Sequence, residues 1–122
     1  MKLLVESGAR LEEKDETGLT PLACAAMKQR SFVVEYLLSK GANPKSKDDE
    51  SLTPFHRAAI KGDLTIMKLL VGKCSEGLDL EDMDRRTPLD CAKDFFHWEV
   101  AKYIEEHKVK ILIQNYYKLL IT

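Results

Sequence analysis

A ten-residue pattern centred on a Thr-Pro pair occurs three times in this chain at nearly constant spacing. The copies read GLTPLACAAM at 18–27, SLTPFHRAAI at 51–60 and RRTPLDCAKD at 85–94. Their threonines lie 33 and 34 residues apart. Self-similarity at such a period is typical of solenoids, in which every unit buries apolar surface against its neighbours. The sequence therefore predicts a tandem array of repeated units.

Each repeated unit contains two predicted helices. The threonine of each Thr-Pro pair suits an N-cap, and the proline suits the first helical position, where its missing N–H costs nothing. A second apolar segment follows in each unit and begins at 32, 64 and 98. Its apolar residues recur at helical spacing, as Ile66, Leu69 and Leu70 do. We therefore expect an all-α solenoid of helix pairs.

The repeated pattern resembles the ankyrin repeat, in which T-P-L-H-x-A recurs every 33 residues and a Gly-Ala pair closes the second helix. Thr53, Pro54 and His56 match this motif, whereas Phe55 occupies the leucine position. The resemblance covers nearly the whole chain, from the KLLVESGA fragment near the start to residue 108. It implies stacked antiparallel helix pairs with projecting β-turn or hairpin loops. It also implies a concave surface that binds other proteins.

We expect one ankyrin-repeat domain over residues 1–122. Its parts are a partial repeat at 1–14, repeats at 15–47, 48–81 and 82–108, and a C-terminal helix at 109–122 that caps the array or binds a partner. The chain opens in the middle of a unit, so Leu3, Leu4 and Leu22 are expected near an unshielded end. Because terminal repeats normally need a polar cap, the chain is either a fragment of a longer array or covered by another copy.

The segment VKILIQNYYKLLIT at 109–122 has helical spacing and only a narrow polar stripe, formed by Lys110, Gln114 and Lys118. It is shorter than the roughly 20 residues that cross a bilayer, and we expect no membrane insertion. Two arrangements are open. The helix either folds back over the preceding repeat, or presents its apolar face to a second subunit or a missing domain. A homo-oligomer could form through the 109–121 helix or through the open N-terminal end.

His56 is the residue that most suggests a chemical site. In the ankyrin family this histidine is a structural hydrogen-bonding partner near the threonine, and the equivalent positions here are Ala23 and Asp90. Cys91 and His97 lack the second pair that a zinc site needs. The chain also contains no glycine-rich phosphate loop, G-x-S-x-G elbow or H-E-x-x-H helix. We therefore expect no catalytic residue, no metal ligand, no cofactor and no enzymatic activity.

Charge and cysteine content narrow the choice of partner and compartment. The 19 basic and 20 acidic residues give a formal net charge of −1, which does not favour nucleic-acid binding. The three cysteines are widely spaced, with no C-x-x-C pair and no secretory leader before them. We therefore expect a reducing, cytoplasmic location and a protein partner.

Acidic residues recur in the predicted projecting loops, which read EEKDE at 12–16, KSKDDE at 45–50 and DLEDMDRR at 79–86. Stacking would align them in a negative edge, and our hypothesis is that a basic protein segment binds in the concave groove. Ordinary solvated turns are the alternative interpretation. The contact positions that the resemblance implies are Glu16, Thr17, Leu19, Met27, Lys28, Asp49, Glu50, Leu52, Ile60, Lys61, Met83, Asp84, Arg86, Asp94 and Phe95.

Three departures from the ankyrin pattern carry expectations of their own. Gln29 and Phe96 stand where the family has a glycine between the helices, so we expect those turns to be made differently. The stretch at 73–83 replaces the Gly-Ala pair and adds one residue. We expect Gly77 to be a flexible point there, and the third loop to differ in shape.

The favoured function is a non-catalytic protein-interaction module whose partner is unknown. The alternative is a structural or self-associating segment of a longer ankyrin array.

Overall fold

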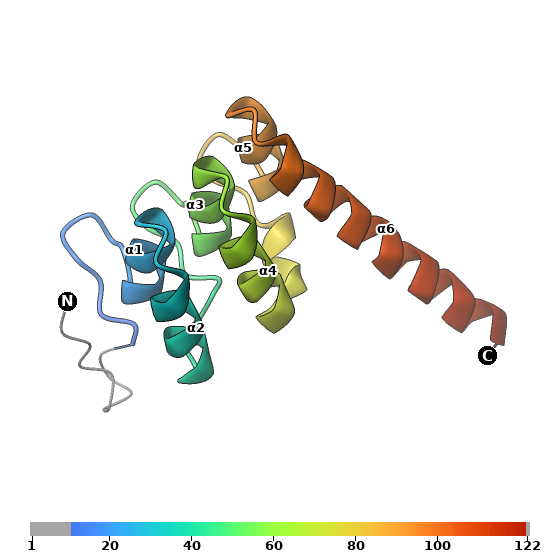
Figure 1. Cartoon of the computed structure of the whole chain (residues 1–122), viewed down its shortest axis with the longest axis horizontal. Coiled ribbons are helices and arrows are strands. Elements are labelled where there is room, and N and C mark those ends of the chain that lie inside the picture. Colours follow the sequence, from blue (N-terminus) through green and yellow to red (C-terminus); the bar gives the residue numbers. More distant parts are fainter. Residues whose placement is uncertain (1–10, 122) are drawn as a thin grey trace.

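The computed structural model describes residues 11–121, and these form two parallel rows of helices (Figure 1). The first helices of successive units are α1 (Pro21–Met27), α3 (Pro54–Lys61) and α5 (Pro88–Asp94); the second helices are α2 (Ser31–Ser39), α4 (Leu64–Lys73) and α6 (Trp98–Ile121). Each helix packs against the next helix of its own row and against its partner in the pair. Residues 11–121 contain no β-strand. The predicted all-α stack of antiparallel helix pairs is confirmed.

The first helix of every pair begins at a Thr-Pro cap, as predicted. Thr20, Thr53 and Thr87 are the N-caps, and each hydroxyl accepts a hydrogen bond from the backbone N–H three residues later, at 3.2 to 3.3 Å. The following proline occupies the first turn in all three helices. Each cap is worth about 1 kcal/mol and fixes where its helix begins.

The core runs continuously along the stack between the two rows. Small side chains line the first helices and allow close approach; these are Ala25, Ala26, Ala58, Ala59 and Ala92. The second helices contribute larger apolar residues that are fully or almost fully buried; these are Val34, Leu37, Ile66, Leu70, Val100 and Ile104. Leu22, expected near an unshielded end, is fully buried. Leu3 and Leu4, the other two residues of that expectation, lie outside the described residues.

The turns between paired helices are the same in all three units, so the expectation that two of them differ is wrong. Gln29 and Phe96 adopt φ values of 57° and 62°, close to the 70° of Gly62. In each turn the next backbone N–H then bonds to a carbonyl of the first helix at 2.8 to 3.0 Å. These bonds hold two bulky residues in the left-handed region, at a strain cost of about 1 to 2 kcal/mol each.

The extra residue of the third unit is absorbed before the loop, by the short 3-10 helix η2 (Ser75–Asp79). Gly77 is buried there, and a Cβ at this position would collide with the ring of Phe55. Gly77 therefore serves close packing, which corrects its expected role as a flexible point.

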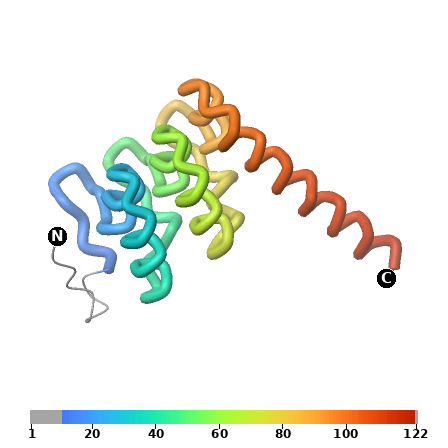
Figure 2. The backbone as a smooth tube through the Cα atoms, viewed as in Figure 1, coloured from blue at the N-terminus to red at the C-terminus, as the bar shows by residue number. Residues whose placement is uncertain are grey.

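Helix α6 is continuous across the expected boundary at 109. Its first half packs through Val100, Ala101 and Ile104, which are buried. The residues from Leu112 to Ile121 are all exposed. The second half extends beyond the stack (Figure 2), so the fold-back arrangement is wrong. A 24-residue helix without a break has no turn with which to reverse its direction.

Candidate functional site

Three loops, here called fingers, precede the first helices and form the candidate binding edge. Finger 1 comprises residues 14–19, finger 2 comprises 47–52 and finger 3 comprises 81–86. Asp15, Asp48 and Asp82 occupy equivalent positions, and one carboxylate oxygen of each accepts two backbone N–H groups at 2.8 to 3.0 Å. The three aspartates therefore brace the turns of their own fingers. The third loop was expected to differ in shape, but finger 3 makes the same bonds as the other two fingers, so this expectation is wrong for its tip.

The bracing role was missed when the loops were interpreted only as a charged edge. A signal for it exists, because an aspartate stands five residues before each N-cap threonine in all three units. Asparagine and aspartate side chains bond to backbone groups two residues ahead in turns of this kind. Hydrogen bonds from the backbone of Leu19 and from the side chain and backbone of Thr17 hold the pKa of the Asp15 carboxyl below its usual value.

Asp82 is a buried carboxylate whose ionised form is favoured by its neighbours. Burial alone would raise the pKa of its carboxyl, but the backbone N–H groups of Arg86 and Asp84 and the Arg86 guanidinium lower it overall. Arg86 also lies 3.5 Å from Asp84 and 3.5 Å from Asp94. The Arg86 cation is thus shared among three carboxylates of the chain itself.

Neighbouring fingers are bonded to one another through the backbone. The N–H of Asp49 donates to the carbonyl of Thr17 at 3.2 Å, and the N–H of Met83 donates to that of Glu50 at 3.4 Å. A Cβ at Gly18 would collide with Asp49, which explains the glycine at the first tip. These contacts keep the three tips in register along one edge.

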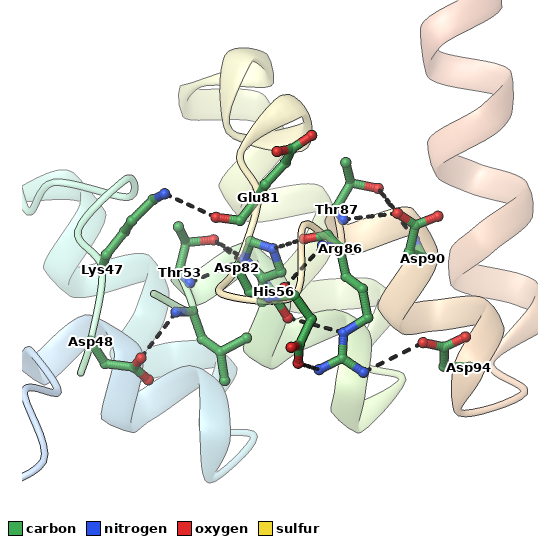
Figure 3. A network of polar contacts seen from close by, with 12 residues as sticks. Lys47, Asp48, Thr53, His56, Glu81, Asp82, Arg86, Thr87, Asp90 and Asp94 are labelled. Carbon is green, nitrogen blue, oxygen red and sulfur yellow. Dashed lines mark hydrogen bonds and ion pairs between the residues drawn. The ribbon is translucent and has the colours of Figure 1, made fainter. Parts of the chain in front are cut away.

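Two lysines continue the connection between fingers. Lys14 Nζ donates to the carbonyl of Lys47 at 3.0 Å. Lys47 Nζ donates to the carbonyl of Glu81 at 2.9 Å (Figure 3). The equivalent residue of finger 3 is Glu81 itself, so the series of lysines stops there. These two cations are engaged in contacts between fingers.

His56 is a structural residue, as predicted, and it connects two repeats (Figure 3). Its Nδ1 accepts from the backbone N–H of Thr53 at 3.1 Å, and its Nε2 lies 2.8 Å from the carbonyl oxygen of Arg86. Because an amide N–H only donates and a carbonyl only accepts, the ring is neutral with its proton on Nε2. Burial lowers the pKa of His56 and favours this neutral form, although the bond to Arg86 opposes the shift.

The contact positions implied by the resemblance separate into three groups. Leu19 and Leu52 are 7% and 6% exposed, so their side chains belong to the core and are closed to a partner. Met27, Ile60 and Arg86 are half-buried. The exposed positions, which we call the finger face, are Glu16, Thr17, Lys28, Asp49, Glu50, Lys61, Met83, Asp84, Asp94 and Phe95.

The described residues were compared with the requirements of a metal site and of a reactive thiol. Residues 11–121 hold no cluster of three or more His, Cys, Asp or Glu side chains that could bind a metal ion. Cys91 is buried, and desolvation raises the pKa of its thiol to about 11. A thiol of that pKa is a poor nucleophile near neutral pH. Among the described residues, no helix is both long and apolar enough to cross a membrane.

Comparison with known protein families supports the interpretation of the stack. Residues 24–71 match the family model described as ankyrin repeats in many copies. The matched segment includes α2 and α3 in full and extends into α1 and α4. No curated protein matches the sequence.

Proposed function

We propose that this chain, of which residues 24–71 match ankyrin repeats, is a non-catalytic module that binds a partner protein on its finger face, and that the partner presents a basic segment. Ankyrin repeats are generally protein–protein interaction modules. The observation that carries the finer proposal is the row of exposed carboxylates at the tips, formed by Glu16, Asp49, Glu50 and Asp84. Their register along one edge is held by the backbone bonds between fingers.

The charge of this edge differs from that of the chain as a whole. The loop segments 12–17, 45–50 and 79–86 together hold 11 acidic and five basic residues, against 20 and 19 in the whole sequence. Lys14 and Lys47 donate to backbone carbonyls, and Arg86 is shared among three carboxylates. Three of the five basic residues are thereby engaged within the chain, and the excess of 11 acidic over five basic residues supports a net attraction for an opposite charge.

Apolar side chains beside the carboxylates could supply the anchors of such an interface. Met83 is 69% exposed and Phe95 is 48% exposed, both on the finger face. Met27 and Ile60 are half-buried at equivalent ends of the preceding first helices. Interfaces commonly obtain most of their binding energy from a few aromatic or apolar anchors within a polar rim.

A peptide-display selection against the full chain tests this proposal. We expect the enriched peptides to carry net positive charge and to dissociate as salt rises, because salt screens exposed charges. Glu50→Lys should weaken their binding. Glu35→Lys is the matched control, since Glu35 is an exposed residue of α2 away from the fingers. Enrichment of neutral or acidic peptides, or equal losses in both variants, would contradict a basic partner.

We further propose a reducing, cytoplasmic compartment. The support is that Cys24, Cys74 and Cys91 are all free thiols. Free cysteines persist where thiols are kept reduced. The location of the tagged full chain in cells and the oxidation state of its thiols are the two quantities to measure.

A further inference from the structure

The second half of α6 presents a continuous apolar surface. We call residues 109–121 the distal helix. Eight of its large apolar side chains are between 49% and 83% exposed; these are Val109, Leu112, Ile113, Tyr116, Tyr117, Leu119, Leu120 and Ile121. Contiguous exposed apolar surface commonly marks an interaction site.

This apolar surface is not a continuation of the face that α6 buries. Successive residues of a helix turn by about 100°. Viewed along α6, the buried Val100, Ala101 and Ile104 lie on one side, whereas the exposed Val109, Ile113, Tyr116 and Leu120 project from roughly the opposite side. The stack of repeats therefore does not cover the distal helix.

The distal helix carries charge opposite to that of the finger carboxylates. It contains Lys110 and Lys118 and no acidic residue, whereas Lys108, just before it, lies 3.3 Å from Asp79. The remaining 109 residues hold all 20 acidic residues and 17 of the 19 basic ones. The distal helix is thus a basic amphipathic segment, which is the chemistry that the proposed function assigns to the partner.

A single copy cannot bring these two surfaces together. The first half of α6 is fixed against α5 and α4, and the unbroken helix carries the distal half away from the stack (Figure 2). The complementary surface must therefore come from another molecule. A second copy supplies both the acidic edge and the apolar anchors.

We infer that the distal helix of one copy docks on the finger face of a second copy. This inference rests on the proposed function of the finger face. The lengths agree, because 13 residues of helix span about 20 Å and three neighbouring first helices, at 8–10 Å per step, span roughly 16–20 Å. Each copy has one donor surface and one different acceptor surface, so the contact is head-to-tail and generates rings or open chains.

Two other occupants fit less well. A symmetric pair of distal helices covers only a narrow seam, whereas the exposed apolar residues occupy about half the circumference and the flanking lysines would face like charges. A bilayer surface of anionic lipid would attract the lysines, but the acidic remainder of the chain would be repelled from it.

The test uses sedimentation velocity of the full chain over a range of concentrations and salt. We expect assembly beyond a dimer, weakened by salt. A donor-defective variant, Leu112→Asp with Leu120→Asp, and an acceptor-defective variant, Asp49→Lys with Glu50→Lys, should each associate about tenfold or more weakly. All four positions are exposed, and circular dichroism checks that each variant is folded.

Mixing the two variants gives the decisive result. The donor-defective chain keeps its finger face and the acceptor-defective chain keeps its distal helix, so the mixture should form a one-to-one heterodimer that grows no further. A wild-type chain that stays monomeric overturns the inference. So does assembly that only the α6 variant disrupts, which indicates symmetric pairing, and so does flotation of wild-type monomer with phosphatidylserine vesicles.

The same measurements distinguish failure of this inference from failure of the proposed function. If the finger face binds display-selected basic peptides while the chain does not self-associate, only the head-to-tail inference fails. If the selected peptides do not bind the fingers and assembly is unchanged by the substitutions at Asp49 and Glu50, both the head-to-tail inference and the proposed function fail.

Discussion

The Nε2 atom of His56 lies 2.8 Å from the backbone carbonyl oxygen of Arg86, so one imidazole ring joins helix α3 to the base of the next finger. Its Nδ1 atom at the same time accepts the backbone N–H of Thr53, the residue that caps α3. The ring is fully buried. A repeat protein is stabilised through interfaces between neighbours, and this side chain supplies a polar connection across one of them.

His56→Ala should therefore lower the free energy of unfolding by about 2 to 4 kcal/mol, because it leaves the buried N–H of Thr53 without a partner, removes one of the two hydrogen bonds to the Arg86 carbonyl and creates a cavity. His107→Ala is a matched control, since the Nε2 atom of His107 has no hydrogen-bond partner among the described groups. Urea unfolding followed by circular dichroism measures both. Similar losses in the two variants would show that the connection through His56 contributes little.

The same histidine predicts a dependence of stability on pH. Burial lowers the pKa of His56 in the folded chain below its ordinary value of 6.5, so the unfolded chain takes up the proton first as pH falls. The stability present above pH 6.5 should thus decline as pH drops from 6.5 toward the folded pKa. His56→Gln removes this titration, so its unfolding free energy should change less between pH 7 and pH 5. An unchanged slope in that variant would assign the effect to other groups.

The bracing aspartates predict a contrast between adjacent carboxylates of finger 2. Asp48→Ala removes two backbone hydrogen bonds and the ion pair to Arg57, and should cost about 2 to 3 kcal/mol. Asp49→Ala alters an exposed side chain and should cost less than about 0.5 kcal/mol. Thermal unfolding of the two single variants measures the difference. Equal losses would mean that the finger does not depend on its brace.

Much of the architecture could be predicted because its signals are local. Thr53 and Pro54 set the start of α3 through their own backbone chemistry, and the repeat period located the equivalent caps in the other units. The role of Asp48 was missed because a single carboxylate in a polar loop looks the same in sequence whether it braces a turn or faces solvent; only its recurrence five residues before each N-cap threonine indicates the brace. The burial of Leu19 and Leu52 also depends on how the finger folds over the core.

Other errors arose where long-range contacts override a residue's own preference. A glutamine disfavours the left-handed region because of its side chain. Gln29 nevertheless adopts a positive φ, because the backbone N–H of Arg30 then bonds to the carbonyl of Ala25. The course of the distal helix could not be predicted either, because the same amphipathic pattern suits a folded-back cap and a projecting helix. Only the continuity of α6 distinguishes the two arrangements.

The left-handed turns provide the last prediction. Gln29→Gly should stabilise the chain by about 1 kcal/mol, since glycine accepts a positive φ without strain and the Gln29 side chain is exposed. Gly62→Ala should have the opposite sign and a larger size, because its Cβ would meet the ring of His97, whose Nε2 lies 2.9 Å from the Ile60 carbonyl oxygen. Lys28→Gly is the control, as Lys28 has φ of −89° and gains nothing from glycine. Chemical unfolding of the three variants measures the change in the free energy of unfolding. A Gln29→Gly chain that is no more stable than the Lys28→Gly chain would contradict strain at this turn.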